Sequence, residues 1–151
     1  MRKAHADAQK LFRDIGIKMG FKYQKTWNQR YPTDGVWVAR APTLPLEELP
    51  LVALEVSNTE SPKELAGSVA VLEEVSPSLG LLVLQDEDLR RRHVRKGDSI
   101  DEIERILAVK LNRAHELIAK SCQRIEVWTF AQLKHRHRLA SSGRSSILSI
   151  N

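Results

Sequence analysis

The sequence predicts an α/β domain in which helices flank a small mixed central sheet. Two nearly continuous apolar runs, 51–56 and 79–85, are separated by one helical pattern, and strands connected in this way are parallel. Residues 21–27 alternate apolar and polar side chains, as expected for a half-buried strand. The expected order of elements is helix, three strands, helix, strand, helix, strand.

The first half of the chain contains the first helix and three strands. Apolar residues at three- and four-residue spacing predict a helix over 2–19, and Gly20 follows as a C-terminal stop. Strands are expected over 21–27, 36–39 and 51–56, the last covered on both faces. The connection over 41–50 contains three prolines and is expected to be irregular.

The second half begins with a strong helix signal. Ser61 is a candidate N-cap, Pro62 suits the first helical position, and Glu64 completes a capping box. A basic loop is expected after strand 79–85, and a second Ser-x-x-Glu capping box then opens a long helix, 100–121. A last strand over 124–128 and a short helix starting at Thr129 complete the pattern.

Length and composition bound the class of protein. The chain has 151 residues, with 42% hydrophobic and 28% charged residues, which is typical of one globular domain. We assign that domain to 1–140 and expect 141–151 to be a flexible tail. The single cysteine, Cys122, excludes an internal disulfide. No apolar run approaches the roughly 20 residues of a membrane span, and the N-terminus lacks a signal sequence, so we expect a cytoplasmic protein.

Basic residues gather in two short stretches of a chain with a net charge of +5. One stretch is 134–138, and the other contains Arg90, Arg91, Arg92, Arg95 and Lys96. Either could neutralise phosphates and release counterions. Each could equally be a solvated loop or tail. Together they favour a nucleic-acid partner.

Two acidic residues lie where strands begin and end. Asp34 precedes the strand 36–39, and Glu55 lies within or at the end of the buried strand 51–56. A buried carboxylate is costly unless it is paired, hydrogen-bonded or bound to a metal. If these strands are antiparallel neighbours, the two carboxylates converge at one edge of the sheet. The alternatives are that Asp34 is a turn residue and that Glu55 has already emerged into solvent.

A converging pair of carboxylates would suit a hard divalent cation. Asp34, Glu55 and the carbonyl of Val56 are the expected ligands, with waters and a phosphate oxygen completing the set. Mg²⁺ or Mn²⁺ is the expected cofactor. Such an ion can activate water for hydrolysis of a phosphodiester.

The arrangement resembles the PD-(D/E)xK nuclease superfamily, which has the restriction-endonuclease-like fold. In that family an acid opens the second strand and (D/E)-x-K closes the third, which corresponds here to Asp34 and to Glu55-Val56-Ser57. Ser57 stands where the family has lysine. The resemblance implies that Lys63, in the next helix, replaces that lysine and that Asn58 supports it. It also makes Gln85 and Asp14 lower-ranked site residues and implies a homodimer.

The expected function is therefore a metal-dependent endonuclease that hydrolyses DNA. One alternative is a nuclease-fold module with an eroded site, which binds nucleic acid or a protein without cutting. Another is a purely protein-binding subunit, in which the basic stretches are incidental. The enzyme hypothesis requires that Asp34 and Glu55 lie close enough to share one cation and do not face opposite sides of the sheet.

Overall fold

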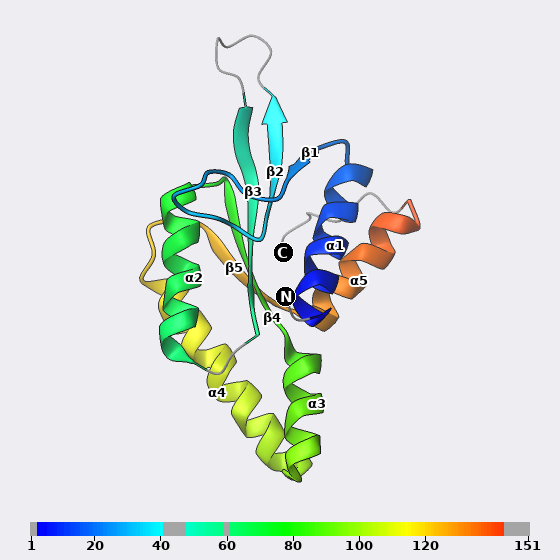
Figure 1. The fold of residues 1–151 in the computed structure, drawn as a ribbon, viewed down its shortest axis with the longest axis vertical. Helices are drawn as coiled ribbons and strands as arrows, with labels where there is room; N and C mark the ends of the chain where they lie inside the picture. Colours follow the sequence, from blue (N-terminus) through cyan, green and yellow to red (C-terminus); the bar gives the residue numbers. More distant parts are fainter. Residues whose placement is uncertain (1–2, 41–47, 59–60, 144–151) are drawn as a thin grey trace.

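The computed structural model describes residues 3–40, 48–58 and 61–143. Figure 1 shows a central sheet with helices on both faces. The elements, in chain order, are α1 (Lys3–Lys18), β1 (Lys22–Gln24), β2 (Gly35–Arg40), β3 (Glu48–Ser57), α2 (Pro62–Val75), β4 (Leu79–Leu84), α3 (Asp86–Lys96), α4 (Ile100–Ala119), β5 (Ile125–Thr129) and α5 (Phe130–Ser141). Within these described residues, no helix combines the length and apolar character needed to cross a membrane.

The five strands lie side by side in chain order, β1-β2-β3-β4-β5. β1, β2 and β3 are antiparallel neighbours, whereas β3, β4 and β5 are parallel. The direct β2–β3 connection gives the antiparallel pair, and the crossover through α2 gives the parallel one. The predicted mixed sheet, including the antiparallel and parallel pairs on which the site depends, is confirmed.

Helices α1 and α5 cover one face of the sheet, and α2 and α4 cover the other (Figure 1). Side chains of β3 alternate between two cores. Leu54 and Val56 pack in the core with Phe12 of α1, whereas Ala53 packs in the core with Leu65 of α2. Because Glu55 alternates with Leu54 and Val56, it faces the α2 side of the sheet.

The stretch predicted as a basic loop is instead helix α3, and that prediction was wrong. The ends of α3 carry charges that complement the helix dipole: Asp86, Glu87 and Asp88 lie in its first turn and His93, Arg95 and Lys96 in its last. Leu89 is buried against Ile103 and Leu107 of α4. Gly97 ends the helix with φ at 89°, in the left-handed region that glycine tolerates. Figure 1 shows α3 and the first part of α4 extending beyond the sheet as a helical pair, which we call the α3–α4 hairpin.

Strand β1 covers only Lys22–Gln24, less than the predicted 21–27. Just after it, the carbonyl of Lys25 accepts a hydrogen bond from Oγ1 of Thr33 at 3.4 Å, so a side chain rather than a neighbouring strand is its partner. The connection predicted as irregular over 41–50 also differs, since 48–50 already belong to β3. The rest of it, 41–47, lies outside the described residues.

Three helix starts were predicted from capping patterns, and all three are confirmed, two of them with the complete capping box. Ser99 forms a complete capping box at α4, and Thr129 forms one at α5. Ser61 lies at the N-cap of α2 with Pro62 in the first turn, but its side chain makes no capping hydrogen bond, so the predicted box is absent there. Helix α5 is longer than the short helix expected and contains the whole basic stretch 134–138. Of the predicted tail, residues 144–151 lie outside the described structure.

Candidate active site at the ends of β2 and β3

The start of β2 holds Asp34 against the end of β3. The Asp34 N–H donates to the carbonyl of Leu54 at 3.0 Å, and its Oδ2 accepts from the N–H of Val56 at 2.8 Å. From α1, Nε2 of His5 lies 2.6 Å from Oδ1, and Nε2 of Gln9 donates to the same oxygen at 3.0 Å. Three donors from two elements therefore fix the position of this carboxylate.

Glu55 is the second acid of the site and is only 9% exposed. Burial and, second, the charge of Asp34 raise its pKa to about 8, while hydrogen bonds from Ser68 and from the Asp34 backbone work in the opposite direction. Its Oε1 is buried and has no hydrogen-bond partner among the described residues. At neutral pH this carboxyl group holds a proton unless a cation lies beside it.

His5 links Asp34 to the residue that follows β3. A carboxylate can only accept, so Nε2 of His5 is the donor to Asp34 and Nδ1 is left to accept from the Asn58 amide, at 2.9 Å. The assignment leaves Oδ1 of Asn58 buried without a partner in the described structure. His5 and Asn58 thus form one hydrogen-bonded network with Asp34.

Arg92 of α3 brings a permanent positive charge to this network. Its Nη2 donates to the carbonyl of Asn58 at 2.6 Å. Its Nε lies 3.2 Å from Oδ2 of Asp88, in ionic contact but outside hydrogen-bond geometry. The side chain is 32% exposed, so part of the guanidinium remains accessible to a ligand.

The ends of β3 and β4 carry further buried polar atoms. The N–H of Gln85 donates to the carbonyl of Ser57 at 3.0 Å, and the Gln85 side-chain amide donates to the carbonyl of Ala4. Oε1 of Gln85 and Oγ of Ser57 are both buried with no partner within the described residues. Buried polar atoms are nearly always satisfied, and these two oxygens are free to accept hydrogen bonds at the ends of β3 and β4.

Several predicted site residues lie elsewhere or act differently. Lys63 is exposed on the first turn of α2, and no described residue forms a hydrogen bond or ion pair with it. Asp14 contacts Arg13 at 3.2 Å and His137 at 3.9 Å, not Asp34. Val56 meets Asp34 through its N–H rather than through the carbonyl predicted as a metal ligand.

The predicted phosphate-binding cluster lies on α3, where part of its charge is already compensated. Arg90 forms an ion pair with Glu104 of α4, and Arg91 lies 3.7 Å from Asp88. Arg95 and Lys96 form no ion pair with any residue in the described ranges. These last two, with the accessible part of Arg92, are the cations of α3 that remain for phosphates.

Two site residues of α1, His5 and Gln9, escaped sequence analysis. They are four positions apart, so they lie on one face of the helix, beside the buried positions Ala4, Ala8 and Phe12. A polar pair next to a buried stripe, in a helix preceding the strand-end acids, was a usable signal. It does not reveal which acid the pair contacts.

The fit of a divalent cation rests on the chemistry of these groups. The favourable features are the oxygen donors of Asp34 and Glu55, the unpartnered Oε1 of Glu55, and the repulsion between the two carboxylates, which a cation would relieve. Among the described residues, no cluster of three or more His, Cys, Asp or Glu side chains is arranged to hold a metal. Glu55 faces the α2 side of the sheet, whereas the side-chain partners of Asp34 come from α1 on the other side. A divalent cation shared by the two acids would therefore have to lie at the strand ends and would need water and substrate oxygens to complete its shell.

No protein-family model, no curated protein and no solved structure matches this chain, and its function is inferred from the geometry above.

Proposed function

We propose that this protein is a metal-dependent endonuclease that hydrolyses phosphodiester bonds in DNA, and that its mixed sheet is a restriction-endonuclease-like fold. Support comes from the order of elements and from the acids at the start of β2 and the end of β3. The single observation that carries the proposal is the buried carboxyl of Glu55, which has an unpartnered oxygen and whose pKa is raised in part by the charge of Asp34.

A buried acid with an unpaired oxygen destabilises a fold, and a second carboxylate nearby adds repulsion. An apolar residue at position 55 would suit the core between β3 and α2 better. The pair acquires a purpose if a divalent cation lies against both acids, because the cation offsets the repulsion and favours the ionised form of Glu55. Binding of the cation would then release the proton of Glu55.

The residues of the chain have distinct tasks in this proposal. Asp34, held by its three donors, presents a carboxylate in a fixed orientation. Glu55 provides the second carboxylate once its proton has left. A bound divalent cation supplies Lewis acidity toward a phosphate oxygen and toward the attacking water. His5 positions Asp34 through its Nε2–H and so acts on the reaction only through that carboxylate.

Arg92 takes the electrostatic role that the resemblance assigned to Lys63. It reaches Asn58 at the end of β3, whereas Lys63 makes no contact with the described site. A guanidinium can stabilise charge on the phosphate that is being cleaved. It cannot act as a general base, because it stays protonated at any relevant pH.

The α3–α4 hairpin gives the substrate a surface next to these groups. Arg95 and Lys96 lie on the same helix as Arg92 and carry uncompensated charge within the described structure, as expected for contacts to a phosphate backbone. Cutting both strands of a duplex needs two such sites, so we propose that the protein acts as a homodimer.

The test is cleavage of plasmid and linear DNA by purified protein with Mg²⁺ or Mn²⁺. Wild-type protein is expected to cut, Glu55→Gln to lose activity, and Glu74→Gln, which changes an exposed glutamate of α2, to keep it. Cleavage that persists in Glu55→Gln would show that the acid pair is not the active site. In a parallel assay, Mg²⁺ should raise the melting temperature of the wild-type protein more than that of Glu55→Gln.

A second candidate function is a nuclease-fold module that binds nucleic acid or a protein without cutting. The observation in its favour is Ser57, whose buried hydroxyl stands in the position of the family lysine. This candidate predicts salt-sensitive DNA binding that is unaffected by Glu55→Gln and no cleavage with either metal.

A further inference from the structure

A concave surface lies between the first turn of α2 and the middle of α4. Its main hollow has a volume of about 230 Å³. An adjoining hollow of about 180 Å³ shares Pro62, Leu65 and Arg113 with it and continues along α4 to Lys120. We call the two hollows together the α2–α4 groove. None of its lining residues belongs to the site around Asp34 and Glu55, so the inference below does not depend on the proposed nuclease function.

The floor of the main hollow is apolar. Pro62 and Leu65 contribute from α2, and Ile106 and Val109 contribute from α4. Val109 is 54% exposed, because the face of α4 that enters the core consists of other residues, such as Leu107. The groove therefore presents apolar side chains that the fold does not bury, in a hollow rather than on a convex surface.

Three cations border the same hollow: Arg105, Lys110 and Arg113. No acid is among the described residues that line it. Across the described part of the chain, neither Arg105 nor Arg113 forms an ion pair. The adjoining hollow differs, because it is lined by both Glu116 and Lys120. Positive charge is thus concentrated at the end of the groove that contains Arg105.

We infer that the α2–α4 groove binds an acidic amphipathic segment of a partner protein. An apolar side chain of that segment fills the main hollow, and its carboxylates face Arg105 and Arg113. This occupant satisfies the apolar floor and the charges of Arg105 and Arg113 together. A nucleic-acid backbone would satisfy only the cations, because its phosphates stay hydrated and leave Val109 and Ile106 uncovered. Glu116 gives the segment a direction, with its acidic end toward Arg105.

The inference can be tested by panning phage-displayed random dodecapeptides on the full-length protein. Enriched peptides are expected to combine a large apolar residue with nearby Asp or Glu. Val109→Glu and Arg113→Glu should each weaken binding of these peptides by at least tenfold. Ile17→Glu, which alters an equally exposed apolar residue on α1, should leave binding unchanged.

A charge-reversal variant makes the test sharper. The double variant Arg105→Glu with Arg113→Glu should select peptides that keep the apolar residue but carry Lys or Arg in place of the acids. Peptide binding is compared only among variants whose melting temperature equals that of the wild-type protein. Val109→Ala removes only apolar surface and is compatible with the helix. If a charged variant fails to fold, weaker peptide binding by Val109→Ala replaces it as the test.

Four outcomes would overturn the inference. The first is that panning enriches peptides no more on wild type than on Val109→Glu, and the second is that enriched peptides bind this variant as tightly as wild type. The third is that no such peptide is found but an oligonucleotide binds in a way that depends on Val109. The fourth is that the protein forms a dimer that Val109→Glu dissociates. The last two would assign the groove to nucleic acid or to a second copy of the chain.

Discussion

At the scale of single residues, the buried carboxyl of Glu55 couples folding to pH. Its pKa is raised from 4.5 to about 8, so between these values the native state holds one more proton than the unfolded state. The free energy of unfolding must therefore fall as pH rises through this window. The stability that comes from the protonated group is complete below the window and has gone above it.

Glu55→Gln removes this dependence, because the amide stays neutral. From about pH 5 to about pH 9 the variant should gain stability relative to wild type, on the order of 3 kcal/mol. Urea unfolding at a series of pH values measures the difference. Curves that stay parallel over the whole range would mean that Glu55 is not desolvated in the native protein.

His5→Ala tests the network that holds Asp34. The change removes a donor from Asp34 Oδ1 and leaves the Asn58 amide without its acceptor. We expect a loss of about 1–3 kcal/mol in the free energy of unfolding. The control is His115→Ala, an exposed position on α4, which should change stability little. Equal effects of the two changes in urea unfolding would contradict the network.

The two strand-end acids could be predicted from sequence, because the position of a residue within a strand fixes which end of the sheet it occupies. Their surroundings could not. His5 and Arg92 reach the site from helices, and their contacts depend on how α1 and α3 pack against the strands. Periodicity identifies the buried face of a helix but not the residue that this face meets. Lys63 is the opposite case: it is close to Glu55 in sequence, but no described residue of the site forms a hydrogen bond or ion pair with it.

At the scale of elements, α1 approaches the sheet closely through Gly16. A Cβ atom at this position would lie 2.4–2.8 Å from the ring of Trp37. That ring cannot move aside easily, because it stacks on Phe12 at 4.5 Å and its Nε1 donates to the Phe12 carbonyl at 2.9 Å. The packing of α1 against the sheet, and with it the position of His5, therefore depends on the absence of a side chain at Gly16.

Gly16→Ala should therefore destabilise the protein by about 1–3 kcal/mol through overpacking. Gly67→Ala is the matched change, since Gly67 lies within α2 and a Cβ there meets nothing within 4 Å. It should stabilise by about 0.5–1 kcal/mol, because alanine favours helix. Chemical denaturation of both variants gives the two signs, and a stabilising Gly16→Ala would refute the close approach.

Helices whose starts carry a capping pattern were the easier elements to predict, as α4 and α5 illustrate. Helix α3 was missed because its many charged residues leave only a narrow apolar stripe, with Leu89 and His93 buried. Its charges nevertheless follow the helix dipole, acids first and bases last, and this distribution was the available signal. Ser61 illustrates the limit of pattern reading, because Pro62 starts α2 without a side-chain cap.

At the scale of the whole molecule, the net charge is +5, and some of the basic side chains, such as Arg90, are already ion-paired. If DNA contacts the α3–α4 hairpin, the double variant Arg95→Ala with Lys96→Ala should reduce the slope of log affinity against log salt by about 2. Arg90→Ala should reduce it less, because Glu104 already compensates Arg90. Fluorescence anisotropy over a salt series measures both slopes, and identical slopes would place the DNA elsewhere.

The order and directions of the central strands followed from the sequence, because a short connection requires antiparallel neighbours and a helical crossover requires parallel ones. The extension of the α3–α4 hairpin past the sheet did not follow. It depends on where Gly97 turns the chain and on Leu89 packing against α4. The sequence therefore predicted the sheet that carries the acids better than the surface offered to a substrate.

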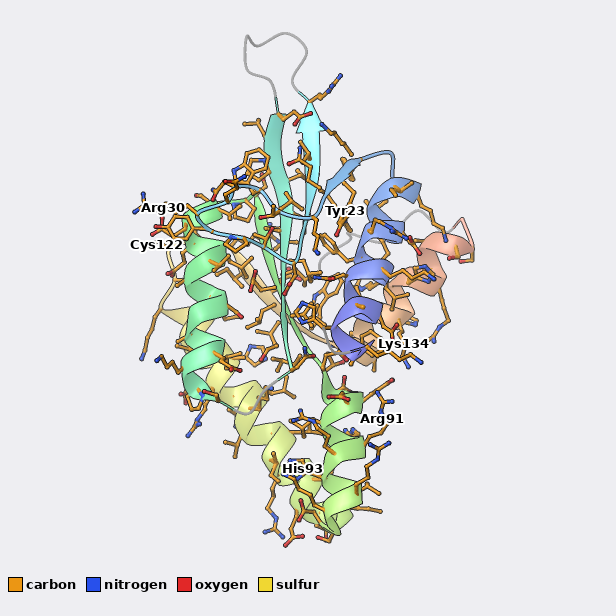
Figure 2. All side chains as sticks on the ribbon, viewed as in Figure 1. Tyr23, Arg30, Arg91, His93, Cys122 and Lys134 are labelled. Atoms are coloured by element: carbon orange, nitrogen blue, oxygen red, sulfur yellow. The ribbon has the colours of Figure 1, made fainter. Side chains whose placement is uncertain are left out.

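The lone thiol of the chain, Cys122, lies away from the cations of α3 and two residues beyond Lys120, at one end of the α2–α4 groove. Figure 2 shows Cys122 well separated from Arg91 and His93, which lie toward the bottom of the view, and the cysteine is exposed. A maleimide dye would thus attach at one defined position of the native sequence, with no engineered handle and no disturbance of Asp34 or Glu55. Ligand binding can then be followed by the fluorescence of that dye without any change to the amino-acid sequence.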